Sequence, residues 1–139
     1  MTAEIDIKPL TNELPSHFAD RVGQLYAKTV TTQHKKDNGQ FFTPTEIAHF
    51  MAGLTKQTKE KLKILDPGCG TVILSSSLIE TLAKQNNTLK EIELVAYETD
   101  QDILPYTQAT LDYLSKWLKK YKIKFKATLD TNDFVLENK

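Results

Sequence analysis

Cysteine is almost absent from the 139-residue chain, with Cys69 as the single example. One thiol cannot form an intramolecular disulfide, and it excludes a metal site built from several cysteines. We therefore expect a reducing, intracellular environment, where proteins without disulfides are usual. His17 and His49 have no partners at the spacing of metal ligands, so the sequence predicts no metal site.

Charge of one sign and long apolar runs are also missing. The 18 basic and 18 acidic residues cancel, which argues against a self-sufficient DNA-binding protein but not against one module of a larger DNA enzyme. No apolar stretch approaches the ~20 residues of a membrane span. The first ten residues include Glu4 and Asp6 and do not resemble a signal peptide. The sequence therefore predicts a soluble, cytoplasmic protein without a membrane partner.

The first 60 residues carry helical patterns. Apolar side chains recur at helical spacing over residues 17–30, namely Phe18, Val22, Leu25 and Tyr26. The polar stretch 31–39 is typical of a loop. A second helix is expected to begin near Pro44, because Thr43 is a suitable N-cap and proline suits the first helical position. Residues 1–60 are therefore interpreted as an N-terminal helical segment.

Residues 61–139 alternate between short apolar runs and helical patterns. Three strands are expected, over residues 63–66, 92–97 and 123–129. A helix over 73–82 separates the first two, and a longer helix, interrupted early by Pro105, separates the last two. This order predicts right-handed crossovers and a parallel sheet, which is half of a doubly wound α/β domain. In such sheets ligands bind beyond the carboxyl ends of the strands.

Three acidic residues follow the three expected strands, namely Asp66, Glu98 and Asp133. An acid after the second strand is well placed to accept both hydroxyls of a ribose, and one after the third could accept the amino group of an adenine. The glycine-rich turn 66–70 opens onto a helix N-terminus, where backbone N–H groups can approach a ligand. The set predicts a pocket for an adenosine-bearing molecule. The simpler alternative is that acids collect at polar strand-to-helix turns.

Four segments resemble the ordered motifs of a known family. They are GQFFTP at 39–44, DPGCG at 66–70, YETD at 97–100 and NDF at 132–134. In this order they resemble the N6-adenine DNA methyltransferases of bacterial restriction–modification systems, over roughly residues 19–135. The resemblance implies a partial Rossmann-like, S-adenosylmethionine-dependent methyltransferase fold. It would contain three parallel strands with flanking helices, preceded by the helical segment.

The resemblance also implies roles at the two outer motifs. Phe41, Phe42 and Thr43 match the segment that folds over the methionine end of the cofactor, although Thr43 suits a plain N-cap equally well. Asp133 matches the acceptor for the adenine amino group. Phe134 could pack against the purine or belong to the core.

The two central motifs match the rest of the cofactor. Asp66 resembles the acid that meets the cofactor's ammonium group, directly or through water, and Gly68 and Gly70 form the backbone turn beneath it. Glu98 matches the ribose-binding acid. The resemblance therefore assigns these residues to S-adenosylmethionine.

Two departures from the family bear on function. Val72 stands where the family usually has a second glycine, and a branched side chain there would intrude on the ligand, so we expect weak cofactor binding or none. The catalytic Asn/Asp-Pro-Pro-Tyr/Phe motif, which holds a flipped-out adenine, does not occur in the 139 residues. The chain alone is therefore expected to be inactive, with no catalytic residue assigned.

The sequence thus predicts the cofactor-binding N-terminal portion of a DNA adenine methyltransferase whose full-length form acts on double-stranded DNA. A non-catalytic binding or oligomerisation module derived from that fold is the alternative. A nicotinamide-dinucleotide domain is disfavoured, because its glycine fingerprint needs glycine where this chain has Val72 and Leu74 or Ser75. Three strands would leave sheet surface uncovered, so the isolated chain is expected to be a homo-oligomer.

Overall fold

One parallel sheet organises the computed structural model, which describes residues 5–37 and 59–137. Its strands lie in the order β1 (Lys61–Asp66), β2 (Glu91–Tyr97) and β3 (Lys124–Asp130). The helices are α1 (Pro15–Ala27), α2 (Thr32–Asp37), α4 (Ile73–Gln85), α5 (Leu104–Leu118) and α6 (Phe134–Glu137), with a 3₁₀ turn at Lys119–Tyr121. The predicted α/β fold of three parallel strands with flanking helices is confirmed.

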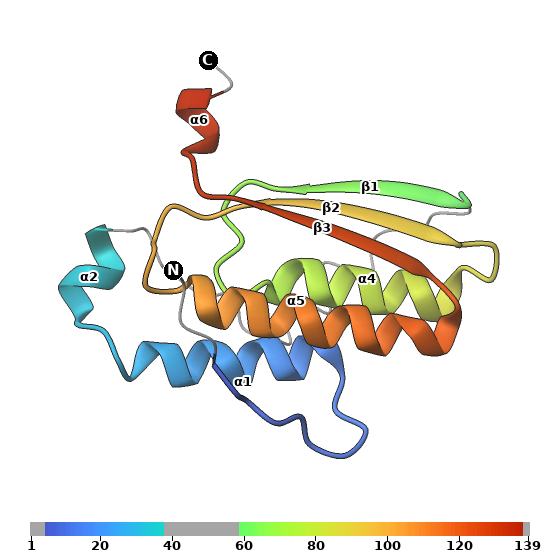
Figure 1. The fold of residues 1–139 in the computed structure, drawn as a ribbon, viewed down its shortest axis with the longest axis horizontal. Coiled ribbons are helices and arrows are strands. Elements are labelled where there is room, and N and C mark those ends of the chain that lie inside the picture. Colours follow the sequence, from blue (N-terminus) through green and yellow to red (C-terminus); the bar gives the residue numbers. More distant parts are fainter. Residues whose placement is uncertain (1–4, 38–58, 138–139) are drawn as a thin grey trace.

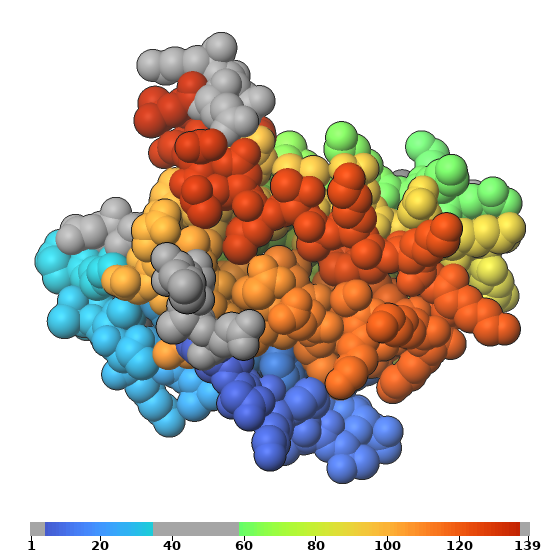
Figure 2. All heavy atoms as spheres, in the orientation of Figure 1, coloured from blue at the N-terminus to red at the C-terminus, as the bar shows by residue number. Residues whose placement is uncertain are grey.

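The described part of the chain forms three layers (Figure 1). Helices α4 and α5 cover one face of the sheet, and α1 lies across the outer side of both. The core fills the space between sheet and helices, and its fully buried members include Ile79, Leu82, Ile92, Leu94, Leu114 and Leu118. Figure 2 shows the helices and β3 packed into one continuous body, from which α6 stands clear.

Helix α1 is fixed to the other layers by close packing and by a buried carboxylate. Its buried face includes Phe18, Val22 and Tyr26. A Cβ added to Gly23 would lie 2.9 Å from Thr71 Oγ1, so only glycine lets the helix approach the turn before α4 this closely. At the start of α1, the backbone N–H of Ser16 donates to Glu80 of α4 at 3.0 Å. Such a carboxylate stabilises a helix N-terminus.

The other face of the sheet carries no helix in the described part of the chain. There the paired residues of the three strands alternate in charge, Lys61–Glu91–Lys124 in one row and Lys63–Glu93–Lys126 in the next. Opposite charges in directly paired positions stabilise a sheet. None of the helices in the described residues has the length and apolar character needed to pass through a lipid bilayer.

The elements differ from the sequence prediction in three places. The stretch 31–39 was predicted to be a loop, but residues 32–37 form α2. Pro105 does not interrupt a helix: it stands in the first turn of α5, where its missing N–H costs no hydrogen bond. Helix α6 was not predicted. The helix expected from Pro44 lies outside the described residues.

Candidate functional site

The carboxyl edge of the sheet gathers the candidate acids. Asp66 is the last residue of β1, and Glu98 follows the last residue of β2. Asp133 comes three residues after the end of β3. Because Tyr97 pairs with Asp130 in a parallel register, these strand ends lie at the same edge of the sheet. Ligands of open α/β sheets bind at this edge.

Glu98 is buried and joins the end of β2 to the glycine turn. Its Oε1 accepts the N–H of Gly70 at 3.0 Å, and its Oε2 accepts the N–H of Asp100 at 3.1 Å. Burial raises the pKa of the Glu98 carboxyl, against the opposing effect of these backbone donors. Each carboxylate oxygen has a second lone pair, so Glu98 can also accept hydrogen bonds from a ligand.

Asp66 holds the other side of the same turn. Its Oδ2 accepts the hydroxyl of Ser75 at 2.7 Å, and its Oδ1 lies 3.4 Å from the N–H of Gly68. Gly70 has a φ of 53°, which favours glycine, and its carbonyl accepts the hydroxyl of Thr107 at 2.6 Å. Asp66 and Glu98 therefore contact the backbone N–H groups of Gly68 and Gly70, two positions apart on the same turn. The hydrogen bond from Thr107 also holds this turn in place.

The space beside Gly68 is open. A Cβ built on this exposed residue would meet nothing within 4 Å. Cys69, the next residue, is buried, and burial raises the pKa of its thiol, with Asp66 and Glu98 adding to the effect. The thiol therefore stays protonated near neutral pH, which argues against a nucleophilic role. The backbone at Gly68 is therefore open to close approach from outside.

Val72 corrects one argument drawn from the sequence. Its side chain is 0% exposed and belongs to the hydrophobic core, so it does not occupy the open side of the turn. This placement gives no support to the steric reason for weak cofactor binding, and the expected affinity itself stays a prediction. The departure from glycine acts on the backbone instead: Val72 has a φ of 68°, a left-handed conformation that is unfavourable for a β-branched residue.

Asp133 and Phe134 lie at the same edge but contact different groups. Asp133 is exposed, and its Oδ1 accepts the N–H groups of Val135 at 2.9 Å and Leu136 at 3.2 Å. It therefore caps the N-terminus of α6. Phe134 packs edge-on against Tyr97, with ring centroids 5.1 Å apart. The remaining candidates, Phe41, Phe42 and Thr43, lie outside the described residues.

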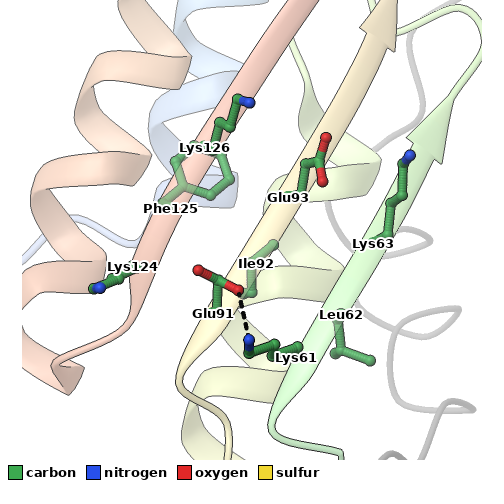
Figure 3. Close-up of a pocket in the computed structure, with 9 residues that line it drawn as sticks. All are labelled: Lys61, Leu62, Lys63, Glu91, Ile92, Glu93, Lys124, Phe125 and Lys126. Carbon is green, nitrogen blue, oxygen red and sulfur yellow. Dashed lines mark ion pairs between the residues drawn. The ribbon is translucent and has the colours of Figure 1, made fainter.

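A second depression lies at the opposite edge of the sheet. It is lined by the first three residues of each strand, 61–63, 91–93 and 124–126 (Figure 3). Lys61 and Glu91 approach to 3.8 Å there, and the remaining charges alternate in the same way. Among residues 5–37 and 59–137, neither a glycine turn nor a helix N-terminus lies at this edge, and it is the edge that ligands of such sheets do not use.

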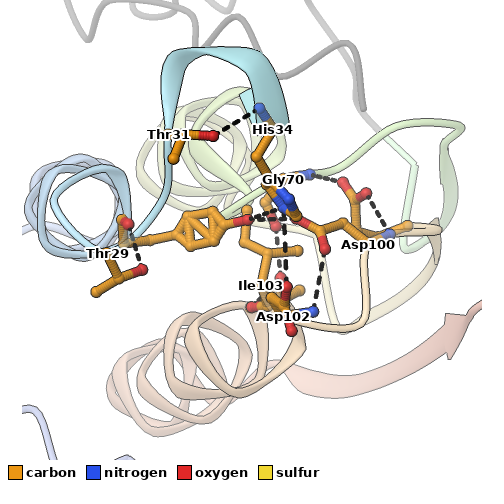
Figure 4. A network of polar contacts seen from close by, with 10 residues as sticks. Thr29, Thr31, His34, Gly70, Asp100, Asp102 and Ile103 are labelled. Carbon is orange, nitrogen blue, oxygen red and sulfur yellow. Dashed lines mark hydrogen bonds and ion pairs between the residues drawn. The ribbon is translucent and has the colours of Figure 1, made fainter. Parts of the chain in front are cut away.

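Three functional candidates were missed by sequence reasoning. Asp100 is buried beside Glu98, and its carboxylate contacts Tyr26 of α1 and His34 of α2 (Figure 4). Tyr26 was interpreted only as part of an apolar helix face. His34 was interpreted as part of a short charged run that could touch DNA phosphates but is more simply a solvated loop, and its contact with Asp100 was not foreseen. The one local signal was the YETD motif itself, which contains Asp100.

Comparison with known proteins identifies the family. Residues 18–138 match the family model described as N-6 DNA Methylase. The chain belongs to this family. Type II methyltransferase M.BsuBI of Bacillus subtilis is 33% identical over 88 residues, which are 63% of this chain and 17% of that protein. Type II methyltransferase M.AccI of Acinetobacter calcoaceticus is 32% identical over 87 residues, 63% of this chain and 15% of that protein.

The N-6 DNA methylase chain is thus much shorter than its relatives and spans less than a fifth of their length. The fold also matches a solved structure. A protein of Listeria monocytogenes assigned to the class I S-adenosylmethionine-dependent methyltransferases superimposes with a TM-score of 0.58 at 20% identity. The match covers 91% of this chain and 36% of that one. The expected Rossmann-like methyltransferase fold is confirmed.

Proposed function

We propose that this chain is the S-adenosylmethionine-binding portion of an adenine-specific DNA methyltransferase of a restriction–modification system. The proposal is carried by Glu98, a buried acid at the end of β2 that is hydrogen-bonded to the glycine turn after β1. A glycine turn and an acid after the second strand are together what an adenosine-bearing ligand requires. Family membership and the named relatives, both type II methyltransferases, support the reaction type.

Each residue of the site has a distinct part in binding. Glu98 accepts the two ribose hydroxyls with the lone pairs that its backbone donors leave. Asp66 attracts the ammonium group, because a partly buried carboxylate interacts strongly with an opposite charge. Gly68 leaves room for the ligand to pass close to the main chain. S-adenosylmethionine supplies an electrophilic methyl group on its sulfonium.

Adenine recognition is assigned to the third strand end. Asp133 uses Oδ1 for both of its cap bonds, so Oδ2 can accept the adenine amino group without loss of the cap. Phe134 stands next to it and offers a ring edge or face to the purine, already braced by Tyr97. Double-stranded DNA is the proposed partner of the full-length enzyme. Because the Asn-Pro-Pro-Tyr motif does not occur here, this chain binds the cofactor without methylating DNA.

Thermal unfolding with added ligands tests the proposal. S-adenosylmethionine and its demethylated product should each raise the unfolding temperature, because a ligand at ~100 times its Kd contributes about 2.7 kcal/mol to stability. NAD should not. Isothermal titration should show that Glu98→Gln weakens S-adenosylmethionine binding about tenfold or more, through loss of charge-assisted hydrogen bonds.

The matched control is Glu93→Gln, a glutamate of β2, the strand that Glu98 follows, on the face of the sheet that carries no described helix. This variant should bind as the wild type does. If no ligand stabilises the wild-type chain, the chain is instead the non-catalytic module derived from this fold. If NAD stabilises it as well as the sulfur cofactor does, the assignment of the glycine turn is wrong.

A further inference from the structure

A buried polar network links the N-terminal helices to the candidate site (Figure 4). At its centre is Asp100, whose side chain is 4% exposed. Its Oδ2 accepts the hydroxyl of Tyr26 and lies 2.9 Å from Nε2 of His34, while Oδ1 accepts the N–H of Asp102 at 3.1 Å. Of these residues, Asp100 alone is part of one of the four sequence motifs.

The backbone of Asp100 contacts the candidate site rather than the N-terminal helices. Its N–H donates to Oε2 of Glu98 at 3.1 Å, and Oε1 of Glu98 accepts from Gly70. The side chain of Asp100 therefore contacts α1 and α2, while its backbone N–H binds Glu98, the proposed ribose-binding acid. The path runs from Tyr26 and His34 through Asp100 to Glu98.

We propose that Tyr26 and His34 are positioning residues of the cofactor site, which set the conformation of the 98–102 turn through Asp100 and thereby orient the carboxylate of Glu98. This inference rests on the proposed function for its consequence, cofactor affinity, but its structural part stands without it. Tyr26 and His34 both contact the carboxylate of Asp100 in this turn. They act through the turn that follows β2.

The burial of the Asp100 carboxylate is the physical reason for this positioning role. A buried carboxylate is costly unless donors surround it, and a partly satisfied buried network is unstable. Tyr26 is 0% exposed and is held in place by an edge-to-face contact with Tyr106, with centroids 5.3 Å apart. Removing its hydroxyl leaves Asp100 with one donor fewer in a site that water does not reach easily. The turn then opens toward solvent, and the N–H of Asp100 moves away from Glu98.

A bound metal ion is the competing interpretation of the same cluster. His34, Asp100 and Asp102 each offer a ligand atom, and these atoms lie within 4.8 Å of one another. The hydroxyl of Tyr26, however, already approaches both His34, at 3.1 Å, and Asp100. A hydrogen-bonded network of these groups accounts for the contacts without an ion, and we adopt it.

Amide hydrogen exchange of the ligand-free chain tests the structural part. In Tyr26→Phe and His34→Gln, the amides of Asp100 and Gly70 should exchange about tenfold faster than in the wild type, because local opening reports the lost hydrogen bond. The exchange rates of amides in the middle of β2 should rise only as far as the fall in global stability predicts, and urea unfolding measures that fall. Tyr121→Phe is the control, since Tyr121 is exposed at the far end of α5. It should leave all of these amides unchanged.

Isothermal titration with S-adenosylmethionine tests the consequence. Both variants should bind about tenfold more weakly than the wild type, a loss of the size of one hydrogen bond. If the wild type fails to bind, the proposed function fails while the exchange result still judges the positioning role. Unchanged exchange at Asp100 and Gly70 in both variants would overturn the inference. Saturable micromolar binding of Zn²⁺ or Mn²⁺ that shifts the His34 ring resonances would also overturn it, in favour of a metal site.

Discussion

The left-handed backbone at Val72 removes the usual stability advantage of alanine over glycine. Val72→Ala removes two buried methyl groups and keeps the unfavourable φ of 68°, so the free energy of unfolding should fall by about 2 kcal/mol. Val72→Gly loses these groups and the buried Cβ carbon as well, but relieves ~1–2 kcal/mol of left-handed strain. Greater freedom of glycine in the unfolded chain costs about 0.5–1 kcal/mol. With the loss of the buried Cβ carbon, worth about 0.8 kcal/mol, these terms nearly cancel, so the glycine variant should be about as stable as the alanine variant.

Urea unfolding at one temperature, followed by circular dichroism, measures both variants against the wild type. The control is Ala109→Gly inside α5, where glycine should destabilise by about 1 kcal/mol relative to alanine. At position 72, in contrast, the glycine and alanine variants should be nearly equal in stability. A glycine variant at position 72 that is less stable than the alanine variant by about 1 kcal/mol or more, as at position 109, would refute the argument, because the backbone at Val72 would then carry no left-handed strain.

Three further predictions follow from the packing and the charges. The hydrogen bond from Arg21 lowers the pKa of Glu13 below its usual value of about 4.5. The pair therefore stabilises the fold above that pH, and this stabilisation is lost as the pH falls through the lowered pKa. In Arg21→Gln, the urea midpoint should fall less between about pH 6 and pH 3 than it does in the wild type. Gly23→Ala should destabilise by about 1–3 kcal/mol in thermal unfolding, since its Cβ would press on Thr71. Burial raises the pKa of Cys69, so iodoacetamide at about pH 8 should modify the native chain far more slowly than the unfolded one.

Local patterns were sufficient for the sheet. Ile92, Leu94 and Ala96 alternate with residues of the open face and are fully buried, which is the period-two signal of a strand. The turn after β1 and the acid after β2 were also located correctly, because glycine and a strand end restrict the backbone locally. The parallel direction of the strands followed from their alternation with helices.

The parts that depend on distant contacts were missed. Residues 32–37 form a helix whose His34 contacts Asp100, 66 positions away in the sequence. No local pattern reports such a partner, and the polar composition of α2 indicates a loop. The left-handed conformation of Val72 was hidden for the same reason: its side chain is held by the core, and this outweighs the preference of its backbone.

Glu98 and Asp133 show why the position of an acid after a strand does not settle its role. Glu98 follows β2 directly, so the chain is still within the buried edge, and its carboxylate turns back to the backbone of Gly70. Asp133 lies three residues beyond β3, where the chain has already left the sheet, and its nearest donors are the exposed N–H groups that begin α6. Burial and chain distance, rather than residue type, separate the two acids. In the proposed site, Glu98 would therefore be a pre-oriented acceptor, whereas Asp133 would contribute through Oδ2 alone, because its Oδ1 accepts the N–H groups that begin α6.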